Sequence, residues 1–236
     1  KGINMQICEN SKVLIVAAHP DDEVLAMGGT IARFKKMGAE VIVQFLGEGI
    51  SARFEKTEFH NRAYQQATDI RKEGAQRALE FLGVSNAIFG EHKCCRFDNI
   101  ELLDLVKEIE RSIEIYAPTT LFTHNPIEVN VDHRITYRAV EAAVRPKPYT
   151  SLKSIYGFEI VCSGNWSFEG QFKPTSYIDI SAEMDTKLLA WGFYEGEERP
   201  FPFPRSVEGL ETLAKFRGMQ SGLLRAEGFQ VFREVS

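Results

Sequence analysis

Short apolar runs alternate with longer segments of helical spacing along the first 146 residues of the chain. Four runs rich in apolar and β-branched residues predict buried strands, at Lys12–Ala18, Glu40–Leu46, Asn86–Phe89 and Thr119–Thr123. Apolar residues that recur with helical spacing predict four helices, at Val24–Met37, His60–Leu82, Ile100–Tyr116 and Asp132–Val144. Strands and helices that alternate in this way are typical of βαβ units. We therefore expect an α/β fold, with a Rossmann-like, mostly parallel sheet and helices on both faces.

The pattern continues with less regular spacing after Pro146. Further strands are predicted at Ser154–Cys162 and Ser176–Ile180, and further helices at Ala182–Phe193 and Val207–Leu224. No internal repeat or change of composition marks a boundary. We expect one domain over residues 1–236, with a core at about 11–146 and a C-terminal strand and helix elaboration at about 147–236.

Composition and charge exclude several classes of function. The chain has 236 residues and a net charge of −5, and no run of Lys and Arg, so we expect no nucleic-acid partner. No apolar run approaches the roughly 20 residues of a transmembrane helix, so no membrane span is expected. The N-terminal segment, residues 1–12, is too polar for a secretory signal.

The four cysteines indicate a reducing compartment. In a chain of this size they do not make a disulfide framework, and adjacent cysteines lack the Cys-x-x-Cys spacing of a thiolate zinc site. They are Cys8, Cys94, Cys95 and Cys162. We expect a reduced, cytoplasmic protein.

The segment VLIVAAHPDDEVLAMGG, from Val13 to Gly29, carries the strongest chemical signal. It places His19, Asp21, Asp22 and Glu23 at the carboxyl end of the first predicted strand, where open α/β sheets bind ligands. An imidazole and a carboxylate three residues apart can hold one divalent cation and leave another carboxylate for proton transfer. Alternatively, the acids only stabilise the N-terminus of the following helix.

Ala18-His19-Pro20-Asp21-Asp22-Glu23 resembles, without a gap, the AHPDDE signature of the LmbE-like or PIG-L family of metal-dependent N-deacetylases. The resemblance implies hydrolysis of the acetamide of an N-acetylated amino sugar, a small-molecule partner, to acetate and a free amine. It implies Zn²⁺ as the cofactor, with another divalent ion such as Fe²⁺ as the alternative. A weaker similarity at Pro204–Glu208 implies bacterial surface-glycan or nucleotide-sugar biosynthesis. The oligomeric state stays open, a homo-oligomer included.

A catalytic zinc takes three protein ligands, so a third ligand is expected from the end of another strand. His133 follows the fourth predicted strand, and Asp132-His133 matches the end of the family's second motif, His-x-x-His or His-x-Asp-His. The resemblance therefore implies His19, Asp22 and His133 as metal ligands, although His133 could be an ordinary first-turn histidine. Asp132 is expected to cap the helix and support a ligand.

Asp21 remains as the general base, because it is the aspartate left over when Asp22 binds the metal. Glu23 is expected to support the site or to charge the helix N-terminus. Asn130 stands where the family has an earlier histidine, and an amide can donate a hydrogen bond to an oxyanion but cannot carry a proton. His124 could supply that proton instead, or it could be a structural residue.

Two further positions resemble residues of the family that contact substrate. Arg71 matches an arginine that binds a phosphate or glycan, and Asp98 matches an acid that holds a sugar hydroxyl. Alternatively, Arg71 is a solvated cation on a helix face, and Asp98 is a loop or N-cap aspartate. Two other functions remain open: a metal-dependent amidase acting on a non-sugar acetamide, and an inactive sugar-binding protein, which only the loss of the histidine at Asn130 favours.

Overall fold

Strands from both halves of the chain form one sheet. The computed structural model describes residues 9–148 and 150–235, so the predicted free cysteine Cys8 and most of the polar N-terminal segment lie outside the described residues. The described strands pair in the order β3-β2-β1-β4-β5-β7-β6. Their bounds are β1 Lys12–Ala17, β2 Glu40–Gly47, β3 Asn86–His92, β4 Thr120–His124, β5 Ser154–Phe158, β6 Ser176–Asp179 and β7 Ala226–Glu234. The strands β1 to β5 are parallel to one another, whereas β7 is antiparallel to both β5 and β6.

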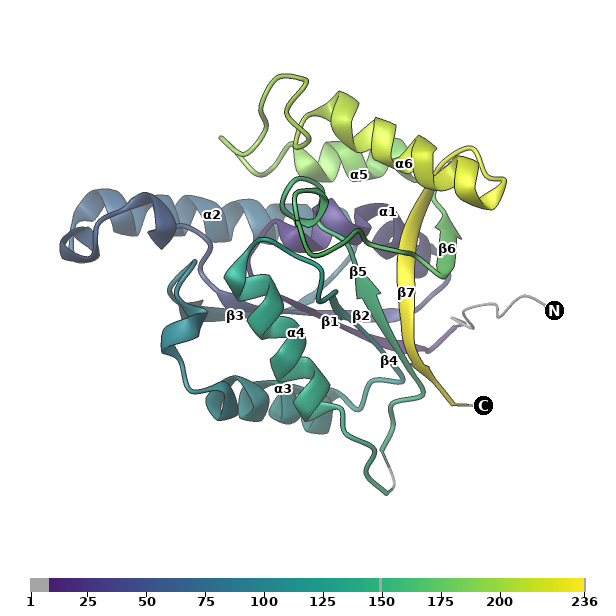
Figure 1. Cartoon of the computed structure of the whole chain (residues 1–236), viewed down its shortest axis with the longest axis horizontal. Helices are drawn as coiled ribbons and strands as arrows, with labels where there is room; N and C mark the ends of the chain where they lie inside the picture. The colour runs from purple at the N-terminus through teal and green to yellow at the C-terminus, as the bar shows by residue number, and fades with distance from the viewer. Residues whose placement is uncertain (1–8, 149, 236) are drawn as a thin grey trace.

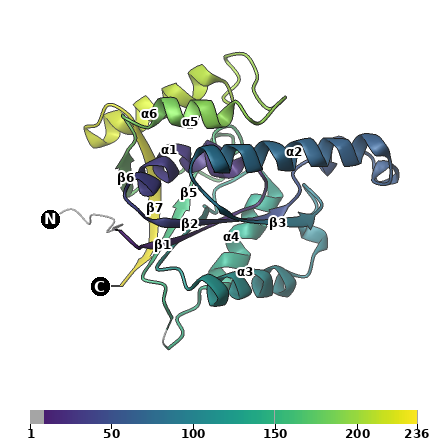
Figure 2. The same cartoon turned by 180° about the vertical axis from the view of Figure 1, so that it is seen from behind.

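Helices cover both faces of this sheet (Figures 1 and 2). The described α-helices are α1 Asp22–Lys36, α2 Arg62–Phe81, α3 Leu102–Tyr116, α4 Val131–Ala143, α5 Met184–Trp191 and α6 Val207–Ser221. One face carries α1, α2, α5 and α6, and the other carries α3 and α4 (Figure 1). The predicted fold class, an α/β fold with a mostly parallel sheet, is confirmed. No helix in the described ranges combines the length and the apolar character that crossing a membrane requires.

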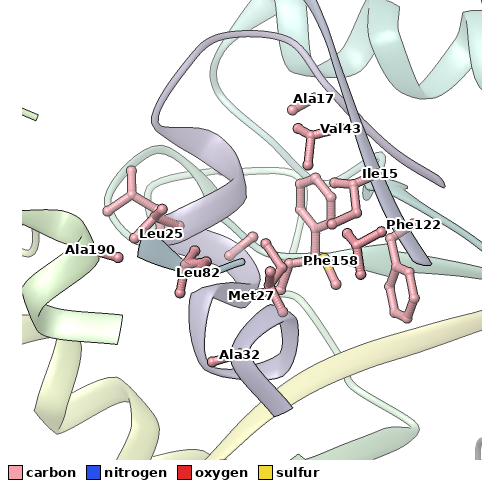
Figure 3. Packing of buried hydrophobic residues seen from close by; sticks show 14 of the residues in the cluster. Ile15, Ala17, Leu25, Met27, Ala32, Val43, Leu82, Phe122, Phe158 and Ala190 are labelled. Atoms are coloured by element: carbon pink, nitrogen blue, oxygen red, sulfur yellow. The ribbon is translucent and has the colours of Figure 1, made fainter. Parts of the chain in front are cut away.

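The central strand β1 is buried on both sides, which explains its unbroken apolar sequence. Val13 and Ile15 point into the core beneath α1, while Leu14 and Val16 point into the core beneath α3 and α4. Figure 3 shows Ile15 in the first of these cores, together with Met27 of α1. Because β1 cannot move without disturbing both cores, the residues that follow its carboxyl end have a rigid base.

The strand β7 was not predicted from the sequence. It enters the sheet between β5 and β6, so the C-terminal residues extend the same sheet as the core. The predicted division into a core and an elaboration stays a prediction. The strand predicted at Ser154–Cys162 ends earlier, at Phe158, because the chain then turns into the loop that carries Cys162. The other predicted helices and strands are present, with ends that differ by up to three residues.

Helix α1 is interrupted at Met27, whose backbone (φ −149°, ψ 28°) leaves helical geometry. The interruption frees backbone groups that two buried side chains then satisfy. Lys187 Nζ donates to the carbonyl of Leu25 at 2.9 Å, and Glu227 accepts from the amides of Gly29 at 3.1 Å and Thr30 at 2.7 Å. Lys187 and Glu227 also pair with each other at 2.6 Å. The second half of α1 therefore depends on a carboxylate from β7.

Candidate metal centre and active site

The predicted metal ligands converge at the carboxyl ends of β1 and β4, two adjacent parallel strands. His19 follows β1 by two residues, Asp22 begins α1, and His133 lies in the first turn of α4. Asp22 and His133 have no exposed surface, and His19 is 5% exposed. Parallel pairing of β1 with β4 thus brings together residues more than 100 positions apart in the sequence, as the motifs predicted.

The three residues of this group each offer a ligand atom, and these atoms lie within 4.8 Å of one another, close enough to hold one metal ion. Asp22 Oδ1 lies 3.3 Å from His133 Nε2, and Asp22 Oδ2 lies 3.7 Å from His19 Nδ1. Asp22 Oδ1 and His133 Nε2 are buried and make no hydrogen bond within the described chain. Buried polar atoms are rarely left without a partner, so two such atoms facing each other fit a missing cation. Two imidazoles and a carboxylate form a donor set suited to Zn²⁺ or Fe²⁺.

Each candidate imidazole is oriented by a carboxylate on its other ring nitrogen. His19 Nε2 lies 2.8 Å from Asp132 Oδ2, and His133 Nδ1 lies 2.9 Å from Glu128 Oε2. These contacts leave His19 Nδ1 and His133 Nε2 directed at Asp22. Such pairs fix the tautomer and the ring orientation of a metal-binding histidine. The role of Glu128 as the partner of His133 was not predicted from the sequence, although Glu128 lies only five residues before His133.

Two alternative metal groups occur within the described residues, His19-Cys94-Asp132 and His124-Glu128-His133. Both would use ring nitrogens or carboxylates already engaged with each other, namely His19 with Asp132 and His133 with Glu128. The His19-Asp22-His133 group uses the atoms that those pairs leave free. It is the group that the geometry favours.

Protonation equilibria show that the centre attracts positive charge. Although burial raises the pKa of Asp22, the imidazoles of His133 and His124 hold it well below its usual value. Burial lowers the pKa of His133, but the carboxylates of Asp22 and Glu128 outweigh it and raise the pKa to about 10. The carboxylates that favour a proton on His133 would equally favour a bound cation.

Asp21 is held in an unusual backbone conformation directly before α1. Its φ of 137° lies in the left-handed region that residues with a side chain rarely adopt. The backbone amide of Asp21 donates to Glu23 Oε2 at 3.1 Å, and Tyr194 donates its hydroxyl to Glu23 Oε1. Burial raises the pKa of Glu23 to about 8, against the opposing hydrogen bond from Tyr194. Glu23 thus supports the backbone of Asp21.

The Asp21 side chain is buried between two arginines. Arg71 Nη1 lies 2.9 Å from Asp21 Oδ2, and Arg205 Nη1 lies 3.1 Å from the same oxygen. Burial raises the pKa of Asp21, while Arg205 and Arg71 act in the opposite direction. Arg71 also donates to the carbonyl of Pro20 and pairs with Glu197. Arg71, predicted to contact substrate, therefore contacts Asp21 in this structure.

His124 is 1% exposed and packs between His133, with a ring separation of 4.1 Å, and Phe158, at 4.8 Å. Its Nε2 accepts a hydrogen bond from the backbone amide of Ala18 at 3.0 Å. Burial lowers the pKa of His124 to about 4, so its ring is neutral near pH 7. A neutral ring whose accepting nitrogen is engaged by a backbone amide fits a structural role.

Asn130 is the N-cap of α4, because its Oδ1 accepts from the amide of Asp132 at 2.9 Å. The expectation that Asp132 caps this helix is wrong. Asp132 lies inside the first turn and accepts instead from His19 and from the amides of Cys95 and Phe97. The Nδ2 group of Asn130 donates to none of the described residues, so it is available to a ligand.

Asp98 lies away from these contacts. It is exposed, in the short helical turn Phe97–Asn99, and accepts from the side chain of Asn99 at 3.0 Å. The structure does not bring Asp98 against the metal group, although the neighbouring Phe97 amide binds Asp132 at 3.0 Å. Its predicted contact with a sugar hydroxyl stays a prediction.

Over most of its length the chain resembles two proteins named as deacetylases, one archaeal and one bacterial. It is 28% identical over 244 residues to a diacetylchitobiose deacetylase of Thermococcus kodakarensis, covering 97% of this chain and 85% of that protein. It is 30% identical over 190 residues to a probable N-acetyl-alpha-D-glucosaminyl L-malate deacetylase 2 of Bacillus cereus, covering 78% and 83%.

Solved structures share the fold. The N,N'-diacetylchitobiose deacetylase of Pyrococcus horikoshii superposes with a TM-score of 0.76 at 23% identity, covering 94% of this chain and 84% of that one. The 4-carboxy-2-hydroxymuconate hydratase GalB of Pseudomonas putida superposes with a TM-score of 0.74 at 21% identity, covering 96% of this chain and 98% of that one. Proteins of this fold thus catalyse more than one reaction, so the fold alone does not identify the reaction of this chain.

The family assignment rests on the sequence itself. The profile of PIG-L, the GlcNAc-PI de-N-acetylases, matches residues 14–144, which is more than half of the chain and spans His19, Asp22 and His133. The chain belongs to the PIG-L or LmbE-like family of GlcNAc-PI de-N-acetylases.

Proposed function

We propose that this protein is a metal-dependent deacetylase that hydrolyses the acetamide of an N-acetylated amino sugar. The observation that carries the proposal is a buried pair of atoms without a hydrogen bond, Asp22 Oδ1 and His133 Nε2, which face each other at 3.3 Å beside the oriented carboxylate of Asp21. A hydratase also needs a group that accepts a proton from water, so the family match over residues 14–144 is what favours amide hydrolysis here. Asp21 has the chemistry to accept a proton from water and to return it to an amine.

His19, Asp22 and His133 would hold the divalent ion. When bound, such an ion supplies Lewis-acid activation of water and of an amide carbonyl. Asp21 would accept the proton from the attacking water as the carbon–oxygen bond forms. It would then return that proton to the departing nitrogen as the carbon–nitrogen bond breaks, giving acetate and a free amine.

Asn130 would donate a hydrogen bond from Nδ2 to the developing oxyanion. Its Oδ1 caps α4 at 2.9 Å, so the amide is already oriented with Nδ2 pointing away from the helix. We assign the proton transfers to Asp21 alone, because the low pKa of His124, about 4, keeps its ring neutral at physiological pH.

The substrate class is inferred from the relatives. The names of the archaeal and Bacillus relatives specify diacetylchitobiose and a glucosaminyl malate, both N-acetylated glucosamine derivatives. An N-acetylglucosamine unit, free or linked to a nucleotide, lipid or second sugar, is therefore the first substrate to test. We propose that the protein acts in bacterial surface-glycan or nucleotide-sugar biosynthesis.

Acetate release tests the proposal. The purified protein, supplied with Zn²⁺ or Fe²⁺, is assayed against N-acetylglucosamine, diacetylchitobiose, UDP-N-acetylglucosamine and N-acetylated amino acids. Turnover of one or more of the sugars, lowered by at least about 10²-fold in Asp21→Asn, supports the proposal. Turnover of the amino acids alone indicates an amidase for non-sugar acetamides. Sugar binding without acetate release in any arm indicates an inactive sugar-binding protein.

A further inference from the structure

A loop of the C-terminal elaboration reaches the candidate base. The loop joins α5 (Met184–Trp191) to α6 (Val207–Ser221) and carries Glu197 and Arg205. Arg205 Nη1 lies 3.1 Å from Asp21 Oδ2, across 184 positions of sequence. Asp21 and Glu197 keep about 5% and 4% of their side-chain surface, and Arg205 keeps 19%. An ion pair this deeply buried is not an ordinary surface contact.

The two arginines share one oxygen of Asp21. Arg71 Nη1 at 2.9 Å and Arg205 Nη1 at 3.1 Å both contact Oδ2. The other oxygen, Oδ1, makes no hydrogen bond within the described residues. The carboxylate is thus fixed through one oxygen, while the other remains available to accept a proton. Two donors that converge from different segments restrict rotation of the carboxylate more than either donor alone.

Glu197 joins the two arginines behind Asp21. Its Oε1 pairs with Arg71 Nη2 and Arg53 Nη2, and its Oε2 lies 3.6 Å from Arg205 Nη1. Glu197 is therefore placed to hold both guanidinium groups against Asp21. Three arginines and two carboxylates from four segments of the chain then form one network.

We propose that Arg205 is a positioning residue, which together with Arg71 orients the Asp21 carboxylate so that Oδ1 faces the reacting water. This inference rests on the proposed function, because it takes Asp21 as the base. It predicts that Arg205 contributes to the rate of the chemical step and contributes little to substrate affinity. A guanidinium suits this role better than an ammonium, since its planar group can contact two carboxylates at once, here Asp21 and Glu197.

Steady-state kinetics test this role. With N-acetylglucosamine or diacetylchitobiose, whichever the wild type hydrolyses, Arg205→Ala should lower kcat by about 10- to 100-fold with KM nearly unchanged, the usual effect of a misplaced catalytic group. Arg205→Lys should recover part of kcat. Added guanidinium chloride at millimolar concentration should raise the kcat of Arg205→Ala. A rise in KM with unchanged kcat would instead make Arg205 a substrate contact and would overturn the inference.

Arg199→Ala is the matched control. Arg199 is an exposed arginine of the same loop, and among the described residues its side chain donates only to the carbonyls of Gly196 and Glu198. The kcat of the Arg199→Ala variant should stay within about twofold of the wild-type value, and added guanidinium should not change it. An equal loss in both variants would show that disturbance of the loop, and not the contact with Asp21, lowers activity.

A second measurement does not depend on the reaction. Urea unfolding of the metal-free protein is followed for the wild type, Arg205→Ala, Asp21→Asn and the double variant. The effect of Arg205→Ala on the unfolding midpoint should be larger in the wild-type background than in Asp21→Asn. If coupling is found and no substrate is hydrolysed, the proposed function fails while the contact stands. If the two effects add independently, the positioning role is overturned whatever the activity.

Discussion

Asp132 fixes the orientation of His19: its Oδ2 lies 2.8 Å from His19 Nε2, although 113 positions separate the two residues in the sequence. The same carboxylate accepts from the amide of Cys95 and, through Oδ1 at 3.0 Å, from the amide of Phe97. Three donors thus converge on one acidic group with no exposed surface. A carboxylate can accept all three, because it has acceptor sites on both oxygens.

Asp132→Asn should therefore weaken metal binding. An amide has one accepting oxygen and one donating nitrogen, so it cannot serve all three donors, and His19 loses part of its orientation. We expect metal affinity to fall by about 10- to 100-fold, the usual effect of removing such a partner. Competition with a fluorescent chelator measures it. Asp185→Asn, an exposed residue on α5, should bind like the wild type; equal affinity in Asp132→Asn would contradict this account.

The metal centre itself should be stoichiometric. With His19, Asp22 and His133 as ligands, the purified protein should bind about one divalent ion per chain. His133→Ala should lose most of it, while His60→Ala, at an exposed position outside the site, should retain it. Elemental analysis by mass spectrometry gives both numbers. An unchanged metal content in His133→Ala would remove His133 from the ligand set.

Asp21→Asn separates proton transfer from metal binding. The substitution leaves His19, Asp22 and His133 in place, so the metal content should not change. Turnover should fall by about 10²- to 10⁴-fold, the usual contribution of a general base. Acetate release and elemental analysis on the same preparation measure both effects. A variant that loses its metal would show that Asp21, and not only Asp22, binds the ion.

Asn130 combines two roles that different substitutions can separate. Serine caps helices about as well as asparagine, whereas alanine does not. Asn130→Ala should therefore lower the free energy of unfolding by about 1 kcal/mol, and Asn130→Ser should stay close to the wild type. Both variants lack the Nδ2 donor and should lose kcat/KM. If only the alanine variant loses kcat/KM, Asn130 acts through the helix and takes no part in the reaction.

A pH effect on stability is expected away from the site, at His92 of β3. Its Nε2 lies 2.8 Å from Glu108 Oε1, and this hydrogen bond raises the pKa of His92 above 6.5. A histidine with a raised pKa adds stability that is complete below its unfolded pKa and is lost as the pH rises through its folded pKa. The stability difference between wild type and His92→Gln should be larger near pH 6 than near pH 9.

Because the Glu108 carboxylate is 41% exposed, that contribution should stay below about 1 kcal/mol. Urea unfolding at both pH values measures it. A difference that is the same at pH 6 and pH 9 would contradict the pairing of His92 with Glu108.

The sequence predicted the elements and residues that depend on local pattern. The strand before His19 is apolar on both faces because both faces are buried, and the acids after it stand at a strand end, so this part of the site could be located without a structure. The third candidate ligand, His133, was placed in the same way, at the end of another predicted strand, and the structure brings it against Asp22. Motif and periodicity are sufficient to predict a candidate site residue where the residues next to it in the sequence carry the signal.

Much of what the sequence did not predict depends on contacts between distant segments. Nothing near Glu197 or Arg205 in the sequence indicates that they pair with Arg71 and Asp21. Glu128 lies only five residues before His133, but no local pattern indicates that the loop turns its carboxylate onto the ring. The strand β7 was missed because half of its residues are only partly buried and it enters the sheet out of chain order. Asn130 was predicted as an oxyanion donor, but its helix cap became visible only in the structure.

The dependence of α1 on Glu227 has a consequence for the order in which the protein is made. The first helix carries Asp22, yet the amides of Gly29 and Thr30 in its second half bind a carboxylate some two hundred positions later. During translation these amides have no such partner until β7 emerges from the ribosome. We therefore expect the segment that carries Asp22 to reach its final form only after Glu227 has been synthesised, and chains interrupted before Glu227 to fold poorly.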